Sequence, residues 1–271
     1  APEADILFAK PFTNGGFPED RTIDAMNYLV QKAQALGQPI AINMSLGGQF
    51  GAHDGTSAQE QVVNTLSGAG VVFCIAAGNE GADYIAEAGP ATGHDFLLRV
   101  PSYTPSPGAD NDAWIVTVWY DGATNATVEV AVGAYSSGVI TSGGTGGGST
   151  GYGYVIVDNA SQGVDPASGD KYCLIQVDDR AGTVVAADDW TITLSGGSGT
   201  ANAWVATSTM VAGFPNSDQS YSIGMPATAE AAVAVAAWKT RNSWLSVAGQ
   251  REYGGDWGAV AVGDLAPFSS Q

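Results

Sequence analysis

The stretch Val71-Val72-Phe73-Cys74-Ile75-Ala76-Ala77-Gly78-Asn79-Glu80-Gly81 decides the fold of this 271-residue chain. Its first seven residues form an apolar run that predicts a buried strand, and glycines flank the polar turn that follows. Strands that are apolar on both faces are typical of a parallel sheet covered by helices. In such sheets ligands bind beyond the carboxyl ends of the strands, which is where Asn79 stands.

The segments before this strand alternate between helix and strand patterns. Apolar residues recur at spacings of three and four over 23–36, which predicts a helix that ends at Gly37. Residues 39–45 predict a second strand, and residues 57–60 form a capping box in front of a second helix. Residues 5–10 predict a further buried strand. This order indicates a parallel sheet with right-handed crossovers.

From about residue 91 the helical periodicity disappears. Short apolar segments between Gly, Ser and Asp clusters predict an antiparallel, jelly-roll-like β-sandwich, and the Gly-rich stretch 142–151 predicts a flexible loop. The predicted strands are 114–120, 127–132, 153–157, 172–177, 190–194 and 203–207. Near Ile223 the α/β pattern returns, with a buried strand at 232–237. We therefore expect an α/β core in two parts, 1–90 and 222–271, interrupted by a β-sandwich at 91–221.

The charge balance is strongly acidic. Nine Lys and Arg against 27 Asp and Glu give a net charge of −18. Nucleic acid and anionic membranes reward basic residues, so neither is expected as a partner. No apolar run approaches the 18 residues of a transmembrane helix. The acid excess with little Lys indicates an extracellular protein.

Two cysteines, Cys74 and Cys173, are too few for a disulfide framework or a zinc site, and both are expected to be buried strand thiols. The only histidines, His53 and His94, lack a neighbouring second ligand, so both are expected to be loop residues with a structural role or none. Gly55-Thr56-Ser57 looks like a nucleophile motif, but Glu60 three residues later makes Ser57 a helix N-cap.

Asn79 has two interpretations. Its amide could donate a hydrogen bond to a developing oxyanion, and Asn is also a common turn residue; local physics by itself favours the turn. Acidic clusters at 110–112, 178–179 and 188–189 could bind Ca²⁺, but solvated turns are the usual role of such clusters and no metal site is assigned. Four aromatic residues either fill the core of the sandwich or form a binding surface for a glycan or a protein: Trp114, Trp119, Tyr152 and Trp190.

Four segments together resemble the subtilisin-like serine proteases. Residues 1–6 resemble the stretch that leads into the strand beyond the catalytic His of that family, and residues 42–48 resemble its substrate-binding strand. Residues 71–81 resemble the strand that ends in its oxyanion Asn. The fourth segment, 226–236 with 266–271, resembles the run before its nucleophile. The resemblance covers roughly 1–90 and 222–271, and it implies a partial three-layer parallel-sheet core.

The resemblance also implies roles for single residues. Asn79 matches the oxyanion-hole Asn. The strand that pairs with an extended substrate peptide and walls its main specificity pocket is matched by Ser45, Leu46 and Gly47. The opposite wall is matched by Ala76, Ala77 and Gly78. The family's Asp and His motifs are absent, and the only Gly-Thr-Ser, at 55–57, precedes Asn79, which is the wrong order for the nucleophile.

The chain is therefore expected to be an internal fragment of a secreted serine endopeptidase, inactive by itself and without a cofactor. Its expected partners are a polypeptide substrate and the remaining segments of the parent protease; a structural Ca²⁺ in the parent is not assignable here. Two alternatives stay open. One is a non-catalytic subtilase-like protein, and the other is a binding module in which the sandwich recognises a protein or a glycan.

Overall fold

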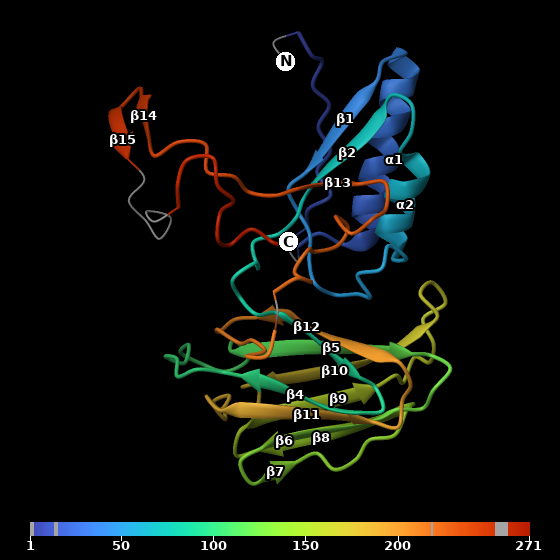
Figure 1. Cartoon of the computed structure of the whole chain (residues 1–271), viewed down its shortest axis with the longest axis vertical. Coiled ribbons are helices and arrows are strands. Elements are labelled where there is room, and N and C mark those ends of the chain that lie inside the picture. Colours follow the sequence, from blue (N-terminus) through green and yellow to red (C-terminus); the bar gives the residue numbers. More distant parts are fainter. Residues whose placement is uncertain (1–2, 14–15, 218, 253–259) are drawn as a thin grey trace.

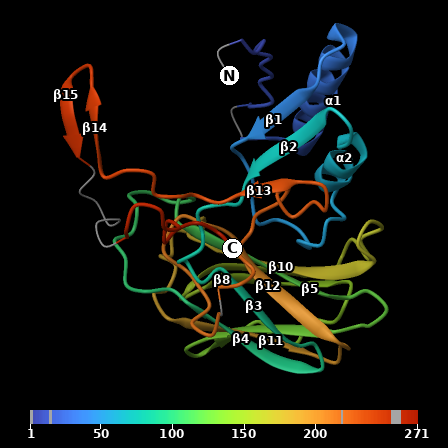
Figure 2. The same cartoon turned by 45° about the horizontal axis from the view of Figure 1, so that its top comes forward.

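The computed structural model describes residues 3–13, 16–217, 219–252 and 260–271. An α/β part lies on one side of a β-sandwich, and the chain passes from the first to the second and back (Figure 1). The same arrangement is visible after rotation, with β12 on the side of the sandwich that faces the α/β part (Figure 2). The structure is rich in sheet and has two helices among these residues.

A parallel sheet of three strands forms the centre of the α/β part, with the order β1-β2-β13. Its strands are β1 (Ile40–Met44), β2 (Val71–Ala76) and β13 (Val233–Val235). Two helices, α1 (Glu19–Leu36) and α2 (Ala58–Leu66), pack against one face of this sheet (Figure 1). Both helices and the strands predicted at 39–45 and 71–77 are thus confirmed.

The helix ends follow the sequence signals. Gly37 stops α1 in a left-handed conformation with φ of 65°, which a residue without a β-carbon adopts at low cost. At the start of α2, Glu60 donates its backbone N–H to Ser57 Oγ, and Ser57 donates its own to Glu60 Oε2. The other carboxylate oxygen of the buried Glu60 accepts the hydroxyl of Thr228 at 2.5 Å. The capping box therefore also ties α2 to the segment before β13.

The second face of the parallel sheet is uncovered in the described part of the chain. The register places Val72 and Cys74 of β2 on this face together with Val233 and Val235, and both valines of β13 are 48 % exposed. The strand predicted at 232–237 is present, but its predicted burial is wrong because no described element packs over it. Cys74 is accordingly only half-buried, whereas Cys173 is fully buried, as predicted.

The buried strand predicted at 5–10 is wrong as well. This segment lies beside β1 without forming a strand, and Ile6 and Phe8 are 91 % and 82 % exposed. Its side-chain link to the sheet region is the hydrogen bond from Gln38 Nε2 to the Asp5 carboxylate at 3.1 Å. An apolar run becomes a strand only where a neighbouring strand satisfies its backbone, and that pairing is missing here.

The sandwich consists of two antiparallel sheets, with the orders β3-β12-β5-β10-β9-β8 and β4-β11-β6-β7. Its strands are β3 (Ala86–Pro90), β4 (Gly93–Arg99), β5 (Ala113–Asp121), β6 (Thr127–Val132), β7 (Tyr135–Ser136), β8 (Gly144–Thr150), β9 (Gly153–Asn159), β10 (Asp170–Asp178), β11 (Asp189–Ser195) and β12 (Thr200–Ser208). All six strands predicted within 91–221 are confirmed. β3 pairs with β12, so residues 86–90 belong to the sandwich. The sequence pattern had predicted them within the α/β part.

Two other sequence interpretations of this region are corrected. The Gly-rich stretch 142–151 was expected to be a flexible loop, but it forms β8 and pairs with β9 along 144–150. Pairing needs only backbone groups, and Gly147 (φ 108°) approaches the carbonyl of Val155 so closely that a β-carbon would collide with it. His94 was expected in a loop and lies in β4.

Three of the four aromatic residues singled out in the sequence pack in or against the core of the sandwich, and the fourth is buried elsewhere. Trp114 and Trp190 are fully buried and meet edge-to-face with ring centroids 5.2 Å apart. Tyr152 packs against the same core, and Trp119 is buried in a smaller cluster on the outer face of the larger sheet. The structure thus removes the exposed aromatic surface on which the alternative of a glycan-binding or protein-binding module rested.

The solvated positions expected for the acidic clusters are found at Asp188 and Asp189, which are exposed, but not at 178–179 or at Asp112. Asp112, Asp178 and Asp179 are buried, and their carboxylates accept local hydrogen bonds. Asp179 Oδ1 accepts the backbone N–H of Asn111 at 2.9 Å, and Asp178 binds the guanidinium of Arg180 at 2.6 and 2.7 Å. Burial by itself would raise the pKa of Asp178, but its hydrogen bonds from Arg180 and Gln176 together outweigh burial and hold the pKa below the usual value.

Near the end of the chain, β14 (Ser243–Ser246) and β15 (Gly249–Glu252) form a hairpin that stands away from both parts (Figure 1). Neither α1 nor α2, the helices of the described ranges, is both long and apolar enough to cross a membrane.

Candidate functional site

A cavity of about 250 Å³ lies at the carboxyl ends of β1 and β2. One wall is the segment that follows β1, and the other is the end of β2 with the turn after it. All seven residues that the sequence analysis selected line this cavity: Ser45, Leu46, Gly47, Ala76, Ala77, Gly78 and Asn79. The structure therefore brings together two segments that are about 30 residues apart in the sequence.

Asn79 lies at the exposed tip of the turn after β2. Its backbone N–H donates to the carboxylate of Glu80 at 2.7 Å. Its side-chain amide has no hydrogen-bond partner within the described residues, so both N–H groups are available to a ligand. The backbone of this turn is fixed while the amide remains free.

The segment 268–271 holds the turn in place. Ser270 donates its backbone N–H to the carbonyl of Gly78 at 3.2 Å and its hydroxyl to Glu80 Oε2 at 3.1 Å. Ser270 Oγ also accepts the backbone N–H of Glu80, and Gly81 donates to the carbonyl of Phe268. Gly78 has φ of 120°, and a β-carbon on it would collide with Glu80 and Ser270, so a glycine is required at this point.

The opposite wall is fixed through Met225. Gly48 and Met225 exchange both backbone hydrogen bonds, at 3.0 and 2.9 Å. A β-carbon on Gly47 would lie 2.8 Å from the carbonyl oxygen of Met225, so the two backbones approach closely here. Gly224 in turn donates to the carbonyl of Ala77 at 2.9 Å, which places this segment between the two walls of the cavity.

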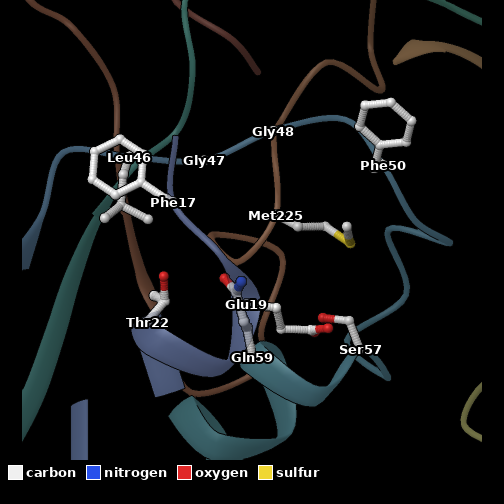
Figure 3. Close-up of a pocket in the computed structure, with 10 residues that line it drawn as sticks. All are labelled: Phe17, Glu19, Thr22, Leu46, Gly47, Gly48, Phe50, Ser57, Gln59 and Met225. Carbon is white, nitrogen blue, oxygen red and sulfur yellow. The ribbon is translucent and has the colours of Figure 1, made fainter. Parts of the chain in front are cut away.

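A second cavity, of about 300 Å³, shares Leu46, Gly47 and Gly48 with the first as lining residues. Figure 3 shows that Glu19 and Gln59, from the starts of α1 and α2, lie on one side of it, whereas Leu46 and Phe17 lie on the other. Residues 46–48 therefore line both cavities.

Both histidines are held by structural contacts. His53 Nδ1 lies 3.0 Å from the carbonyl of Ile223, and the ring stacks on Trp204 with centroids 4.4 Å apart. His94 Nε2 lies 3.0 Å from the buried carboxylate of Glu87. Among the residues that the structure describes, neither ring contacts a serine hydroxyl, and burial lowers the pKa of His53. Both histidines thus make structural contacts, His53 from a loop as expected and His94 from β4. Across the described ranges, no group of three or more acidic, His or Cys side chains is arranged to hold a metal ion.

The model of the subtilase family matches residues 1–252. The chain belongs to the subtilase family. The match runs through the sandwich, whereas the resemblance seen in the sequence was limited to the α/β segments. It ends before 266–271, so the assignment of that run to the approach to the nucleophile stays an interpretation.

Among solved structures, this subtilase resembles the CspB protease of Clostridium perfringens, with a TM-score of 0.68 and 20% sequence identity. The similarity covers 82% of this chain and 46% of that protease, so the chain spans about half of its length. At this identity the likeness concerns the fold. No curated protein sequence matches the chain.

The residues that sequence reasoning missed, although they line or support the cavity at Asn79, include Gln49, Glu80, Gly224 and Ser270. Gln49 and Glu80 directly follow segments that the sequence did select, and proximity alone could have suggested them. Gly224 and Ser270 come from segments more than 140 residues further along the chain. No local pattern connects them to the turn at Asn79, because they reach it only through the return of the chain from the sandwich.

Proposed function

We propose that this chain supplies the oxyanion donor and the substrate cleft of a secreted serine endopeptidase. The observation that carries the proposal is the free side-chain amide of Asn79 at the mouth of a cavity whose opposite wall is Ser45–Gly47. Membership of the subtilase family agrees with peptide-bond hydrolysis and a polypeptide substrate. The acidic composition agrees with an extracellular location.

The chemistry assigned to Asn79 is electrostatic. When a serine oxygen attacks the scissile carbonyl carbon, the π electrons of that bond move onto the carbonyl oxygen. The Asn79 amide donates an N–H to this oxyanion from a turn already fixed by Glu80 and Ser270, so little reorganisation accompanies the reaction.

The substrate lies along Ser45–Gly47 in extended form. The ladder between β1 and β2 ends at the pair Met44 and Ile75, so the next backbone groups are positioned for a peptide strand. Leu46 gives the cavity an apolar wall. Ala76, Ala77 and Gly78 form the facing wall, where small residues leave room for a side chain.

The Asp, His and Ser of a catalytic triad belong, in this proposal, to other segments of the parent protease. His53 is engaged with backbone carbonyls and Trp204, His94 with Glu87, and Ser57 caps α2. A non-catalytic relative would share the cleft and would differ in lacking the triad motifs in the parent sequence.

A peptide titration of the 271-residue chain tests the proposal. The probe is a four-residue peptide p-nitroanilide with Phe beside the anilide, chosen for the apolar wall at Leu46. We expect amide NMR shifts at Ser45–Gly47 and at the Asn79 side chain, without release of p-nitroaniline. Binding confined to the sandwich would contradict the assignment of the substrate cleft. Turnover abolished by a serine-directed reagent would contradict the proposal that the triad belongs to other segments.

A further inference from the structure

A ring stack joins the sandwich to the loop that follows β1 and the wall at Ser45–Gly47. His53 lies on the indole of Trp204 in β12, with centroids 4.4 Å apart and planes within 17°. Ala52 packs against the same cluster, which contains Trp119 and Ala86. This cluster stands on the outer face of the larger sheet, on the side that faces the α/β part (Figure 2).

The polar atoms of both rings contact the segment that returns from the sandwich. Trp204 Nε1 donates to the carbonyl of Tyr221 at 3.2 Å, and His53 Nδ1 lies 3.0 Å from the carbonyl of Ile223. His53 Nε2 lies 3.4 Å from the carbonyl of Gln49 in its own loop. Two rings from different parts of the fold therefore hold the same three residues of backbone, 221–223.

That backbone continues directly into the walls of the cavity. The buried Gln49 donates its Nε2 to the carbonyl of Ser222 at 3.2 Å. Two residues on, Gly224 donates to Ala77, and Met225 exchanges both hydrogen bonds with Gly48. The segment 221–225 thus connects the ring stack to both the wall at Gly48 and the wall at Ala77.

We propose that the sandwich positions the substrate cleft, with Trp204 and His53 as the positioning residues. The stack fixes the returning segment, and that segment sets the separation between the residues after β1 and the turn after β2. Binding sites work best when their walls are held in the productive geometry before a ligand arrives. The use of this cleft by a polypeptide rests on the proposed function, whereas the mechanical coupling does not.

Hydrogen exchange on the whole 271-residue chain tests the coupling. Trp204→Ala removes the stack, and the amides of Gly48, Gly224 and Met225 are expected to exchange about three- to tenfold faster. Amides in the middle of β1 and β2, such as those of Ile42 and Phe73, are expected to keep their rates. Trp204→Phe retains a stacking ring and should restore most of the protection. Trp238→Ala, at an exposed tryptophan, is the matched control and should leave all these rates unchanged.

The proposal is overturned if Gly48, Gly224 and Met225 keep their rates in Trp204→Ala, or if β1 and β2 accelerate by the same factor. Should Trp204→Ala fail to fold, His53→Ala removes the other ring and is expected to give the same local pattern. No peptide enters this measurement. The peptide titration of the same variants then separates the two proposals: a wild-type chain that binds no peptide refutes the proposed function and leaves the exchange result intact.

Discussion

Asn79 donates its backbone N–H to the carboxylate of Glu80, its chain neighbour, at 2.7 Å, and the same carboxylate accepts the hydroxyl of Ser270. The Glu80 carboxylate thus holds the turn through the backbone of Asn79 and leaves the side-chain amide of Asn79 free. We expect Ser270→Ala, which removes that hydroxyl, to lower the free energy of unfolding by about 1 kcal/mol in urea titrations. Ser102→Ala, at an exposed serine, is the control and should have no effect. An equal loss in both variants would contradict the role given to Ser270.

The stability of the fold should depend on pH through His53. Burial lowers the pKa of this side chain below its ordinary value of 6.5, and two backbone carbonyls with Glu60 and Asp54 oppose the shift only in part. The unfolded chain therefore binds the proton at a higher pH than the folded chain. The free energy of unfolding should fall as the pH decreases from 6.5 toward the folded pKa.

Urea unfolding at pH 7.5, 6.5 and 5.5 measures this dependence. His53→Gln has no proton to bind in this range, so we expect a smaller decrease in stability between pH 6.5 and 5.5 than in the wild type. Identical pH profiles for the two proteins would show that burial of His53 does not contribute.

The capping box of α2 offers a matched pair of serines on one helix. Ser57→Ala removes the acceptor for the Glu60 N–H and should cost about 0.5–2 kcal/mol of unfolding free energy. Ser67, at the other end of α2, has a buried hydroxyl without a partner in the described ranges, so Ser67→Ala should be neutral or stabilising. Thermal unfolding measures the stability of both variants. A Ser67→Ala variant that is less stable than Ser57→Ala would contradict the assignment of Ser57 as the N-cap.

The uncovered face of the parallel sheet should make the chain self-associate. Val72, Val233 and Val235 present apolar surface on one face, and parallel sheets are ordinarily covered on both. Light scattering should report an average mass that rises with protein concentration. Val233→Thr with Val235→Thr keeps the strand shape and should reduce that rise, whereas a mass equal to the monomer at all concentrations would contradict the expectation.

The sequence predicted the elements whose local signals agree with their surroundings. These elements are the helix over 23–36, the strands at 39–45 and 71–77, and six of the ten strands of the sandwich. The resemblance to the subtilisin-like proteases also selected residues of both walls of the cavity.

The failures share a physical cause, which is that burial and pairing depend on distant partners. Residues 5–10 have a strand-like composition without a pairing partner, and β13 is apolar without a covering layer. The Gly-rich stretch that forms β8 has little side-chain signal and is ordered by its neighbour β9. Gly224 and Ser270 likewise reach the site through tertiary contacts, so no window of sequence around Asn79 contains them.

The catalytic constant of an Asn79→Ala variant tests the central claim most directly. The measurement is made on the longer peptidase that the proposed function requires, in which these 271 residues are joined to a catalytic triad, with the peptide p-nitroanilide as substrate. We expect kcat to fall by about 10²–10³ with little change in KM, the magnitude known for the oxyanion asparagine of subtilisin, a member of the same family. A kcat equal to that of the unaltered enzyme would contradict the assignment of Asn79 as the oxyanion donor.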